Sequence, residues 1–216
     1  MIHPWLLVPP DDYEAHMKLP QVGQLPVLAE LIREDLERFQ PRSLAVFGCA
    51  TGNGFEHIEP AVTQRVTGVD INPKYLETLS NRHMRRLPGL RLIESDILAL
   101  EAPDEPFDLV HAALIFEYVD PAAALEIVTS WIGPSGNLTV ILQLPSNSSN
   151  PVTSTPYESV RVLSPLLKLV EPDQFEQLAR ERGLSSVDSR SIALPSGKAF
   201  HVTRWRKPGR PEASKT

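Results

Sequence analysis

A glycine-spaced loop followed by an acidic residue is the pattern in this chain with the clearest capacity to bind a ligand. Residues 43–54 read SLAVFGCATGNG, an apolar run that passes directly into glycines. Glycines let the backbone turn sharply and bring its N–H groups close to a ligand. Asp70 ends the next apolar run, 22 positions after Gly48, the spacing at which a strand–helix–strand unit places a carboxylate beside a ribose. The alternative is that Asp70 only caps a helix that begins near Pro73.

A third apolar run ends in groups suited to an adenine ring. Residues 90–95 lead into Asp96, whose carboxylate can accept a hydrogen bond from the exocyclic amine of adenine. Ile71 and Ile97 each follow an acidic residue at a run end and can enclose the ring from two sides. An Asp at the end of a strand is also a common surface feature, so Asp96 alone does not identify a site.

A fourth apolar run, residues 107–115, completes the set. Ala112 and Ala113 lie near its end, and their small side chains leave room for a ligand over the sheet. Ligands of open, mostly parallel sheets bind outside the carboxyl ends of the strands. The four run ends therefore predict one shared crevice.

Side chains that can hold or move a proton follow the fourth run and also lie near the N-terminus. Glu117 and Tyr118 come just beyond the run, whereas Tyr13 and His16 belong to the N-terminal stretch. Glu117 and His16 are candidate general bases, and the two tyrosines can orient a polar acceptor. His111 is a further candidate base, although its position inside the fourth run equally suits a histidine packed in the core.

Metal chemistry is not indicated by the residues. None of the six histidines has a second histidine four positions away with an intervening glutamate, and His57 stands alone between two glutamates. Cys49 is the only cysteine, which excludes an internal disulfide and a thiolate cluster within one chain. We interpret Cys49 as a small packing residue of the glycine loop, and we predict no metal.

Taken together, these motifs resemble those of the class I S-adenosylmethionine-dependent methyltransferases. The resemblance rests on the order and spacing of four segments, residues 47–52, 68–72, 95–96 and 107–119. It covers approximately residues 25–145. It implies that the cofactor is S-adenosyl-L-methionine and that the chain transfers a methyl group to an acceptor.

The resemblance also implies a role for ten residues in holding the cofactor. The loop positions would pack against the methionine part and the ribose, Asp70 would hold the ribose hydroxyls, and Asp96 would hold the adenine. The two alanines of the fourth run would lie near the sulfonium. The ten residues are Gly48, Cys49, Ala50, Gly52, Asp70, Ile71, Asp96, Ile97, Ala112 and Ala113.

Two positions depart from the pattern of the family. Val46 stands where the family usually has an acidic residue, which helps to neutralise the amino group of the cofactor. Ala50 stands where the family usually has a glycine, and its methyl group restricts the backbone angles. Both departures concern the affinity for the cofactor and leave the expected fold unchanged.

Two other functions are compatible with parts of the pattern. A nicotinamide-dependent oxidoreductase expects Gly-x-Gly-x-x-Gly, whereas Gly48, Gly52 and Gly54 are spaced Gly-x-x-x-Gly-x-Gly, so the spacing disfavours it. A non-catalytic sensor or scaffold that binds S-adenosylmethionine would retain the same loop. Val46 and Ala50 are compatible with that alternative, and the sequence has no unmistakable catalytic dyad against it.

Composition and charge favour one domain that acts on a small-molecule methyl acceptor. The chain has 216 residues, of which 42% are hydrophobic, enough for a single core. The net charge of −6 disfavours nucleic acid as a partner. Arg204, Arg206, Lys207 and Arg210 could form a local basic patch, but such clusters are more often solvated strand ends. The oligomeric state is not indicated.

No segment of the sequence favours a membrane partner. Every apolar run is far shorter than the roughly 20 residues of a membrane helix, and residues 1–5 lack the features of a signal peptide. We therefore expect a cytoplasmic protein.

Patterns of apolar residues and helix-terminating residues predict alternating helices and strands. The expected fold is α/β, a Rossmann-like, doubly wound seven-stranded sheet, mostly parallel, with the antiparallel C-terminal strand that the resemblance implies. Helices are expected at 24–39, 73–86, 121–132, 157–168 and 173–182, and strands after the fourth run at 137–144, 185–193 and 198–206.

The predicted organisation is a single methyltransferase domain over residues 1–207 with a flexible tail at 208–216. Residues 1–24 and 145–170 lie outside the cofactor motifs and are candidate covers over the crevice, since a loop as long as the second is usually functional. The cofactor-binding core is expected at 25–145, and a C-terminal helix and hairpin at 171–207.

Overall fold

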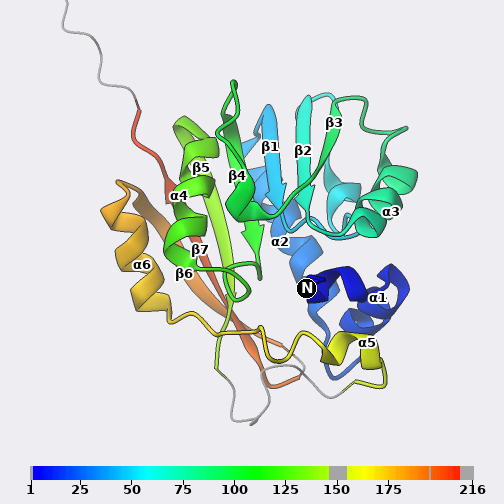
Figure 1. The fold of residues 1–216 in the computed structure, drawn as a ribbon. Coiled ribbons are helices and arrows are strands. Elements are labelled where there is room, and N and C mark those ends of the chain that lie inside the picture. The colour runs from blue at the N-terminus through cyan, green and yellow to red at the C-terminus, as the bar shows by residue number, and fades with distance from the viewer. Residues whose placement is uncertain (1, 146–154, 195, 210–216) are drawn as a thin grey trace, which may run out of the picture.

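The computed structural model, which describes residues 2–145, 155–194 and 196–209, is built on one seven-stranded sheet (Figure 1). The strand order is β3-β2-β1-β4-β5-β7-β6; β7 alone runs antiparallel to its two neighbours. The expected fold class is therefore confirmed. The strands are β1 (Ser43–Phe47), β2 (Arg65–Asp70), β3 (Leu90–Glu94), β4 (Phe107–Ala113), β5 (Ile132–Gln143), β6 (Ser185–Ala193) and β7 (Ala199–Arg206).

Helices cover both faces of the sheet (Figure 1). The α-helices are α1 (Pro10–Lys18), α2 (Gln24–Phe39), α3 (Pro73–His83), α4 (Pro121–Trp131), α5 (Glu158–Arg161) and α6 (Pro172–Glu181). The 3-10 helices are η1 (Pro4–Leu7), η2 (Phe55–His57) and η3 (Ile97–Ala99). Alternation along the buried strands separates two apolar layers, because successive side chains point to opposite faces. Ala45 and Phe47 of β1 pack toward α4 and α6, whereas Leu44 and Val46 pack toward α2 and α3.

The connection between β1 and β2 differs from the expected strand–helix–strand unit. Residues between Phe47 and Arg65 form only the 3-10 turn η2 and no α-helix. Gly52 and Gly54 adopt left-handed backbone angles of φ +85° and +87° on either side of Asn53, and Pro60 follows shortly afterwards. These residues leave no uninterrupted stretch for helical hydrogen bonds. His57 therefore lies in this turn.

The second predicted cover is less helical than expected. A helix was predicted over residues 157–168, whereas α5 comprises only Glu158–Arg161 and is followed by turns. Pro165 supplies a reason, since it has no backbone N–H and disfavours the helical conformation of the residue before it. Residues 146–154 of the expected cover at 145–170 lie outside the described residues.

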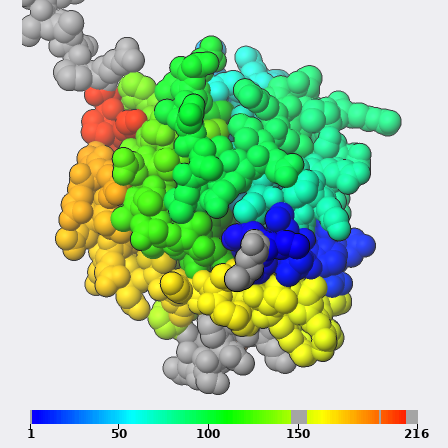
Figure 2. All heavy atoms as spheres, in the orientation of Figure 1, coloured from blue at the N-terminus to red at the C-terminus, as the bar shows by residue number. Residues whose placement is uncertain are grey.

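Two segments far apart in the sequence lie side by side over the carboxyl ends of the strands. In Figure 2 the N-terminal segment, in blue, abuts the segment that contains α5, in yellow. Val8 packs with Val160 and Leu163, and the Ser159 hydroxyl donates a hydrogen bond to Asp12 at 2.5 Å. Both segments expected to be covers thus meet at the same edge of the sheet.

The C-terminal basic residues are used within the fold. Arg204 is buried and pairs with Asp35, while the Lys207 ammonium donates to the backbone oxygens of Thr129 and Ile132. Arg210 and residues 210–216 of the expected tail lie outside the described residues. Of the helices in the described part of the chain, none is long and apolar enough to cross a membrane.

Candidate functional site

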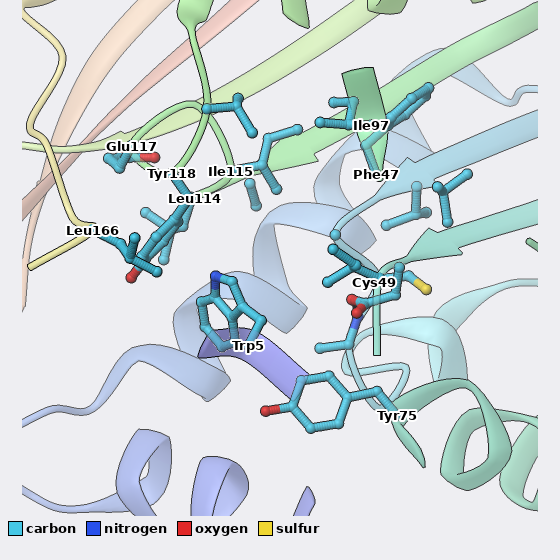
Figure 3. Close-up of a pocket in the computed structure, with 18 of the residues that line it drawn as sticks. Trp5, Phe47, Cys49, Tyr75, Ile97, Leu114, Ile115, Glu117, Tyr118 and Leu166 are labelled. Carbon is cyan, nitrogen blue, oxygen red and sulfur yellow. The ribbon is translucent and has the colours of Figure 1, made fainter. Parts of the chain in front are cut away.

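A cavity of about 740 Å³ opens at the carboxyl ends of β1 to β4, between the sheet and the two covering segments (Figure 3). This volume lies within the roughly 300–1,000 Å³ typical of small-molecule sites. Residues at all four predicted run ends line it, including Gly48, Asp70, Asp96 and Ala113. The predicted convergence of the four strand ends on one crevice is therefore observed.

The glycine loop forms one wall of this cavity. Gly48 has φ +67°, and a Cβ at this position would lie 2.3 Å from Ile115 Cγ2, so only glycine fits. Cys49 packs its sulfur over Gly68 of β2, where an added Cβ would lie 2.9 Å from it. Burial raises the pKa of the Cys49 thiol, which disfavours a nucleophilic thiolate. This geometry agrees with Cys49 as a packing residue.

Asp70 connects the end of β2 to the glycine loop. Its Oδ2 accepts the Ala50 N–H and its Oδ1 accepts the Asn72 N–H, both at 2.9 Å. A carboxylate can accept about four hydrogen bonds, so acceptor capacity remains on the side that lines the cavity. Burial raises the Asp70 pKa to about 6, although both N–H groups oppose this shift.

The helix after β2 is capped by a different residue. Asn72 Oδ1 accepts the Lys74 N–H at 3.0 Å, so Asn72 is the N-cap of α3 and the capping alternative for Asp70 is wrong. Asp96 lines the cavity beside Ile97, and its Oδ1 also accepts the Leu98 N–H at the start of η3.

Two of the ten predicted cofactor residues do not line the cavity. Gly52 faces α3, where an added Cβ would lie 2.8 Å from Leu79 Cγ. Ala112 is fully buried on the face of the sheet that packs against α4. Ala50 lines the cavity and adopts a left-handed φ of +44°, the conformation that a glycine would adopt with less strain.

The opposite end of the cavity contains a buried carboxylate. Glu117 is 2% exposed; its Oε1 accepts the Gln143 N–H at 2.7 Å. Its Oε2 has no hydrogen-bond partner within the described part of the chain. Burial raises the Glu117 pKa to about 7, with the Gln143 N–H opposing the shift. The Glu117 backbone oxygen also accepts the Lys168 N–H, which ties the second covering segment to this end of β4.

Aromatic rings cross the cavity from Tyr118, beside Glu117, through Trp5 to Tyr75 (Figure 3). Trp5 lies between Tyr118 and Tyr75, with ring centroids 5.0 Å and 6.5 Å away. Tyr13 packs against both Trp5 and Tyr75. Burial raises the pKa values of the three tyrosines, so their hydroxyls stay protonated. Tyr13, Tyr118 and Glu117, all predicted as acceptor-side residues, are thus brought together.

His16 is not brought to this site. It is buried on α1, outside the cavity lining, and burial together with the charge of Lys198 lowers its pKa. Its neighbour Glu14 points instead to the glycine loop, where its carboxylate accepts a hydrogen bond from the Thr51 hydroxyl at 2.6 Å and pairs with Arg82. Hydrogen bonds from Arg82 and Thr51 outweigh burial and lower the Glu14 pKa to about 2.

Several lining residues had no role in the sequence-based prediction. Trp5 and Tyr75 reach the cavity from η1 and α3, and Asn53, Gln143 and Leu166 complete it from loops and a strand end. The only signal for Trp5 and Leu166 was their place in the two segments outside the cofactor motifs. Tyr75 lies in an amphipathic helix, where an aromatic residue is expected to pack in the hydrophobic core.

The cavity fits the cofactor that the motifs imply. Asp70 and Asp96, predicted to hold the ribose and the adenine, both line it. Two buried polar atoms, Glu117 Oε2 and His111 Nε2, are unpartnered within the ranges described. In those ranges, no three His, Cys, Asp or Glu side chains are grouped so as to hold a metal ion. The absence of a metal stays a prediction.

Comparison with protein families finds one match, over part of the chain. The family model described as "Methyltransferase domain" matches residues 45–136, which include the end of β1, the glycine loop, and β2 to β4. No curated protein sequence matches the chain.

Solved structures similar to this chain share its fold at low sequence identity. The N-methyltransferase NodS from Bradyrhizobium japonicum WM9, in complex with S-adenosyl-L-homocysteine, has a TM-score of 0.66 and 18% identity over 86% of this chain and 87% of that chain. A putative sarcosine dimethylglycine methyltransferase from Galdieria sulphuraria has a TM-score of 0.67 and 12% identity over 84% and 85%. The [4+2]-cyclase SpnF has a TM-score of 0.67 and 15% identity over 84% and 81%.

Proposed function

We propose that this chain, a class I S-adenosylmethionine-dependent methyltransferase, methylates an amine nitrogen of a small organic molecule. The observation that carries the acceptor class is the buried Glu117 carboxylate, whose Oε2 is unpartnered within the described residues and lines an aromatic cavity. A buried carboxylate is costly unless it is paired. An ammonium group supplies the matching charge and hydrogen-bond donors.

In this proposal the cofactor follows the order of the strands. Asp96 and Ile97, after β3, would hold the adenine, and Asp70, after β2, would accept hydrogen bonds from the ribose hydroxyls. The methionine part would cross the glycine loop toward β4. The hydrogen bond that the Ala50 N–H donates to Asp70 Oδ2 keeps the carboxylate aligned with the loop. When bound, S-adenosylmethionine supplies an electrophilic methyl group on a sulfonium.

The aromatic residues and Glu117 serve the acceptor. Trp5, Tyr13 and Tyr118 present ring surfaces, and a cation over such a ring gains roughly 0.5–2 kcal/mol. The proposal includes a single domain with two covering segments. Residues from both segments enclose the acceptor end. Excluding water there strengthens the attraction between an ammonium and Glu117.

The proposed reaction needs one proton transfer and one displacement. Ionised Glu117 takes a proton from the acceptor ammonium and leaves a neutral amine with a lone pair. The nitrogen lone pair forms a bond to the methyl carbon, and the electron pair of the carbon–sulfur bond goes to sulfur, which leaves S-adenosylhomocysteine as a neutral thioether. Alignment of the three atoms is the main task of the protein and supplies up to roughly 7–11 kcal/mol.

The test uses pairs of acceptors with one carbon skeleton. Aromatic and aliphatic amines are each incubated with the enzyme and S-adenosylmethionine beside the corresponding alcohol and carboxylate, and methylated product is detected by mass spectrometry. We expect methylation of amines only, and loss of at least about a hundredfold in Glu117→Gln. Methylation of alcohols or carboxylates but not amines would refute the acceptor class.

A sensor or scaffold role has no specific support in the geometry. Such a protein needs no base at the acceptor end, whereas Glu117 lies there with its pKa raised to about 7 by burial. NodS, named as an N-methyltransferase, agrees with an amine acceptor. The name of SpnF, a [4+2]-cyclase, illustrates that this fold alone does not fix the reaction.

A further inference from the structure

Val46 and His111 occupy neighbouring positions beneath the glycine loop. The parallel register of β1 and β4 pairs them directly, and both line the cavity. Val46 contributes no polar side-chain atom. His111 is 1% exposed, and its Nε2 has no hydrogen-bond partner among the residues that the structure describes. A buried polar atom left in this state is destabilising, and a ligand group that bonds to it would remove that cost.

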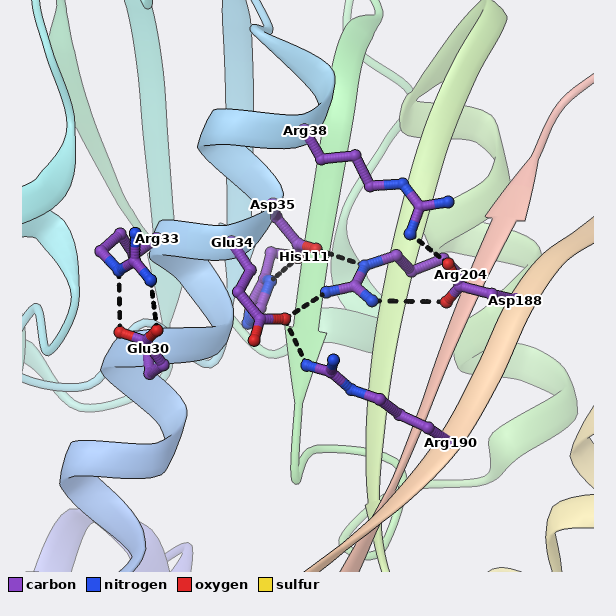
Figure 4. A network of polar contacts seen from close by, with 9 residues as sticks. All are labelled: Glu30, Arg33, Glu34, Asp35, Arg38, His111, Asp188, Arg190 and Arg204. Carbon is purple, nitrogen blue, oxygen red and sulfur yellow. Dashed lines mark hydrogen bonds and ion pairs between the residues drawn. The ribbon is translucent and has the colours of Figure 1, made fainter.

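The other ring nitrogen of His111 is held in place (Figure 4). Nδ1 lies 3.0 Å from Asp35 Oδ2, and Asp35 Oδ1 accepts a hydrogen bond from Arg204 Nε at 2.6 Å. Burial would raise the Asp35 pKa, but its bonds to His111 and Arg204 hold that pKa below its ordinary value. Asp35 is therefore an ionised acceptor, so His111 Nδ1 must be the donor.

The acids around His111 are paired with arginines. Three guanidinium groups and three carboxylates form one connected network, in which each arginine pairs with at least one acid (Figure 4). The members are Arg38, Arg190, Arg204, Glu34, Asp35 and Asp188. Because their charges balance, a neutral imidazole adds no uncompensated buried charge. In a neutral ring with Nδ1–H, Nε2 carries a lone pair and accepts hydrogen bonds.

The proposed placement of the cofactor would bring its amino-acid end to Val46 and His111. The proposed adenine and ribose positions follow β3 and β2, and the strand order then continues through β1 to β4. The assignment that follows rests on the proposed function, since it takes this cavity as the cofactor site. We propose that His111 Nε2 accepts a hydrogen bond from the ammonium of S-adenosylmethionine, with Asp35 fixing the ring, in place of an acidic side chain at Val46.

Calorimetric binding with three ligands tests this assignment without measuring activity. The ligands are S-adenosylhomocysteine, its analogue without the amino group, and 5′-methylthioadenosine, which lacks the whole amino-acid part. We expect His111→Leu to weaken binding of S-adenosylhomocysteine by at least about tenfold, because a hydrogen bond to a charged group is lost. Its affinity for the other two ligands should change by less than about twofold. His111→Gln, which keeps an acceptor oxygen, should recover part of the loss.

The two control ligands separate the possible failures. Equal losses for S-adenosylhomocysteine and the deaminated analogue in His111→Leu would refute the ammonium contact, as would unchanged affinity for both. Retained binding of 5′-methylthioadenosine shows that the leucine variant is folded. If that variant does not fold, the same comparison is made with His111→Gln. Failure of the wild-type protein to bind S-adenosylhomocysteine would instead refute the cofactor site on which the proposed function depends.

Discussion

Glu117 lies in an environment unlike that of an ordinary surface carboxylate. One oxygen is used by the backbone of β5 and the other is unpartnered within the described part of the chain, at 2% exposure. The folded protein therefore holds the Glu117 proton more tightly than the unfolded chain does. The features that suit Glu117 to act as a base toward an ammonium also make its ionisation costly when no cation lies beside it.

The sign of the pH effect follows from the raised pKa. The Glu117 pKa is about 7 in the folded protein, against 4.5 for an unperturbed glutamate. Its stabilising contribution is thus present below about pH 4.5 and is lost as the pH rises toward 7, by roughly 3 kcal/mol. Glu117→Gln keeps an acceptor for the Gln143 N–H and removes this loss. Urea unfolding should show that the variant gains much more stability relative to wild type at pH 8 than at pH 5; an equal difference at both values contradicts the raised pKa.

At the scale of elements, the sequence predicted best where local pattern and tertiary packing agree. The α2 helix occupies 24–39 as expected, because its apolar spacing faces a sheet that is itself apolar. The end of β2 at Asp70 and the place of Asp96 just after β3 were predictable because each apolar run stops near an acidic residue. The turn η2 was missed, since positive φ at Gly52 and Gly54 arises from packing against α3 and α2.

The acceptor end of the site depends on long-range contacts that no local pattern encodes. Asn72 illustrates this: its side-chain nitrogen donates to the backbone oxygens of Trp5 and Val8 at 2.9 Å and 3.2 Å, while its oxygen caps α3. Asn72 was predictable as a residue before a helix, but its bond to the N-terminal cover was not. Trp5 reaches the cavity because of that connection.

Replacing Asn72 should separate these two roles. Asn72→Ser keeps a capping oxygen but removes the donor that holds the cover, so the KM for the acceptor should rise roughly tenfold for two lost hydrogen bonds. Affinity for S-adenosylhomocysteine should change by less than about twofold. Asn72→Ala removes the cap as well and should also lower the free energy of unfolding, by about 1 kcal/mol more. An unchanged KM in both variants would refute the role of this connection in closing the site.

At the scale of the whole molecule, one buried charge network joins α2, β4, β6 and β7. Arg204 is 3% exposed on β7 and bonds to acids from α2 and β6. Through Asp35 the same network reaches His111 on the floor of the cavity. The C-terminal hairpin, itself part of the sheet, therefore supports the site through Asp35 and His111, although none of its described residues lines the cavity.

Removing one member of this network should be costly. Arg204→Met leaves Asp35 buried without its guanidinium partner, so the free energy of unfolding should fall by about 3–5 kcal/mol. Arg190→Met removes an exposed member and should cost at most about 1 kcal/mol. Urea denaturation of both variants at pH 7 measures the difference. Equal losses in the two variants would contradict a stabilising role that depends on burial.

The cofactor site at the ends of β1 to β4 is the claim on which the other assignments depend, and calorimetric titration with S-adenosylhomocysteine tests it most directly. We predict binding of the wild-type protein at micromolar concentration. Asp70→Ala should bind at least about tenfold more weakly, because the acceptor for the ribose hydroxyls is gone. Absence of binding at about millimolar concentration by a folded wild-type protein, or equal affinity in Asp70→Ala, would contradict the account.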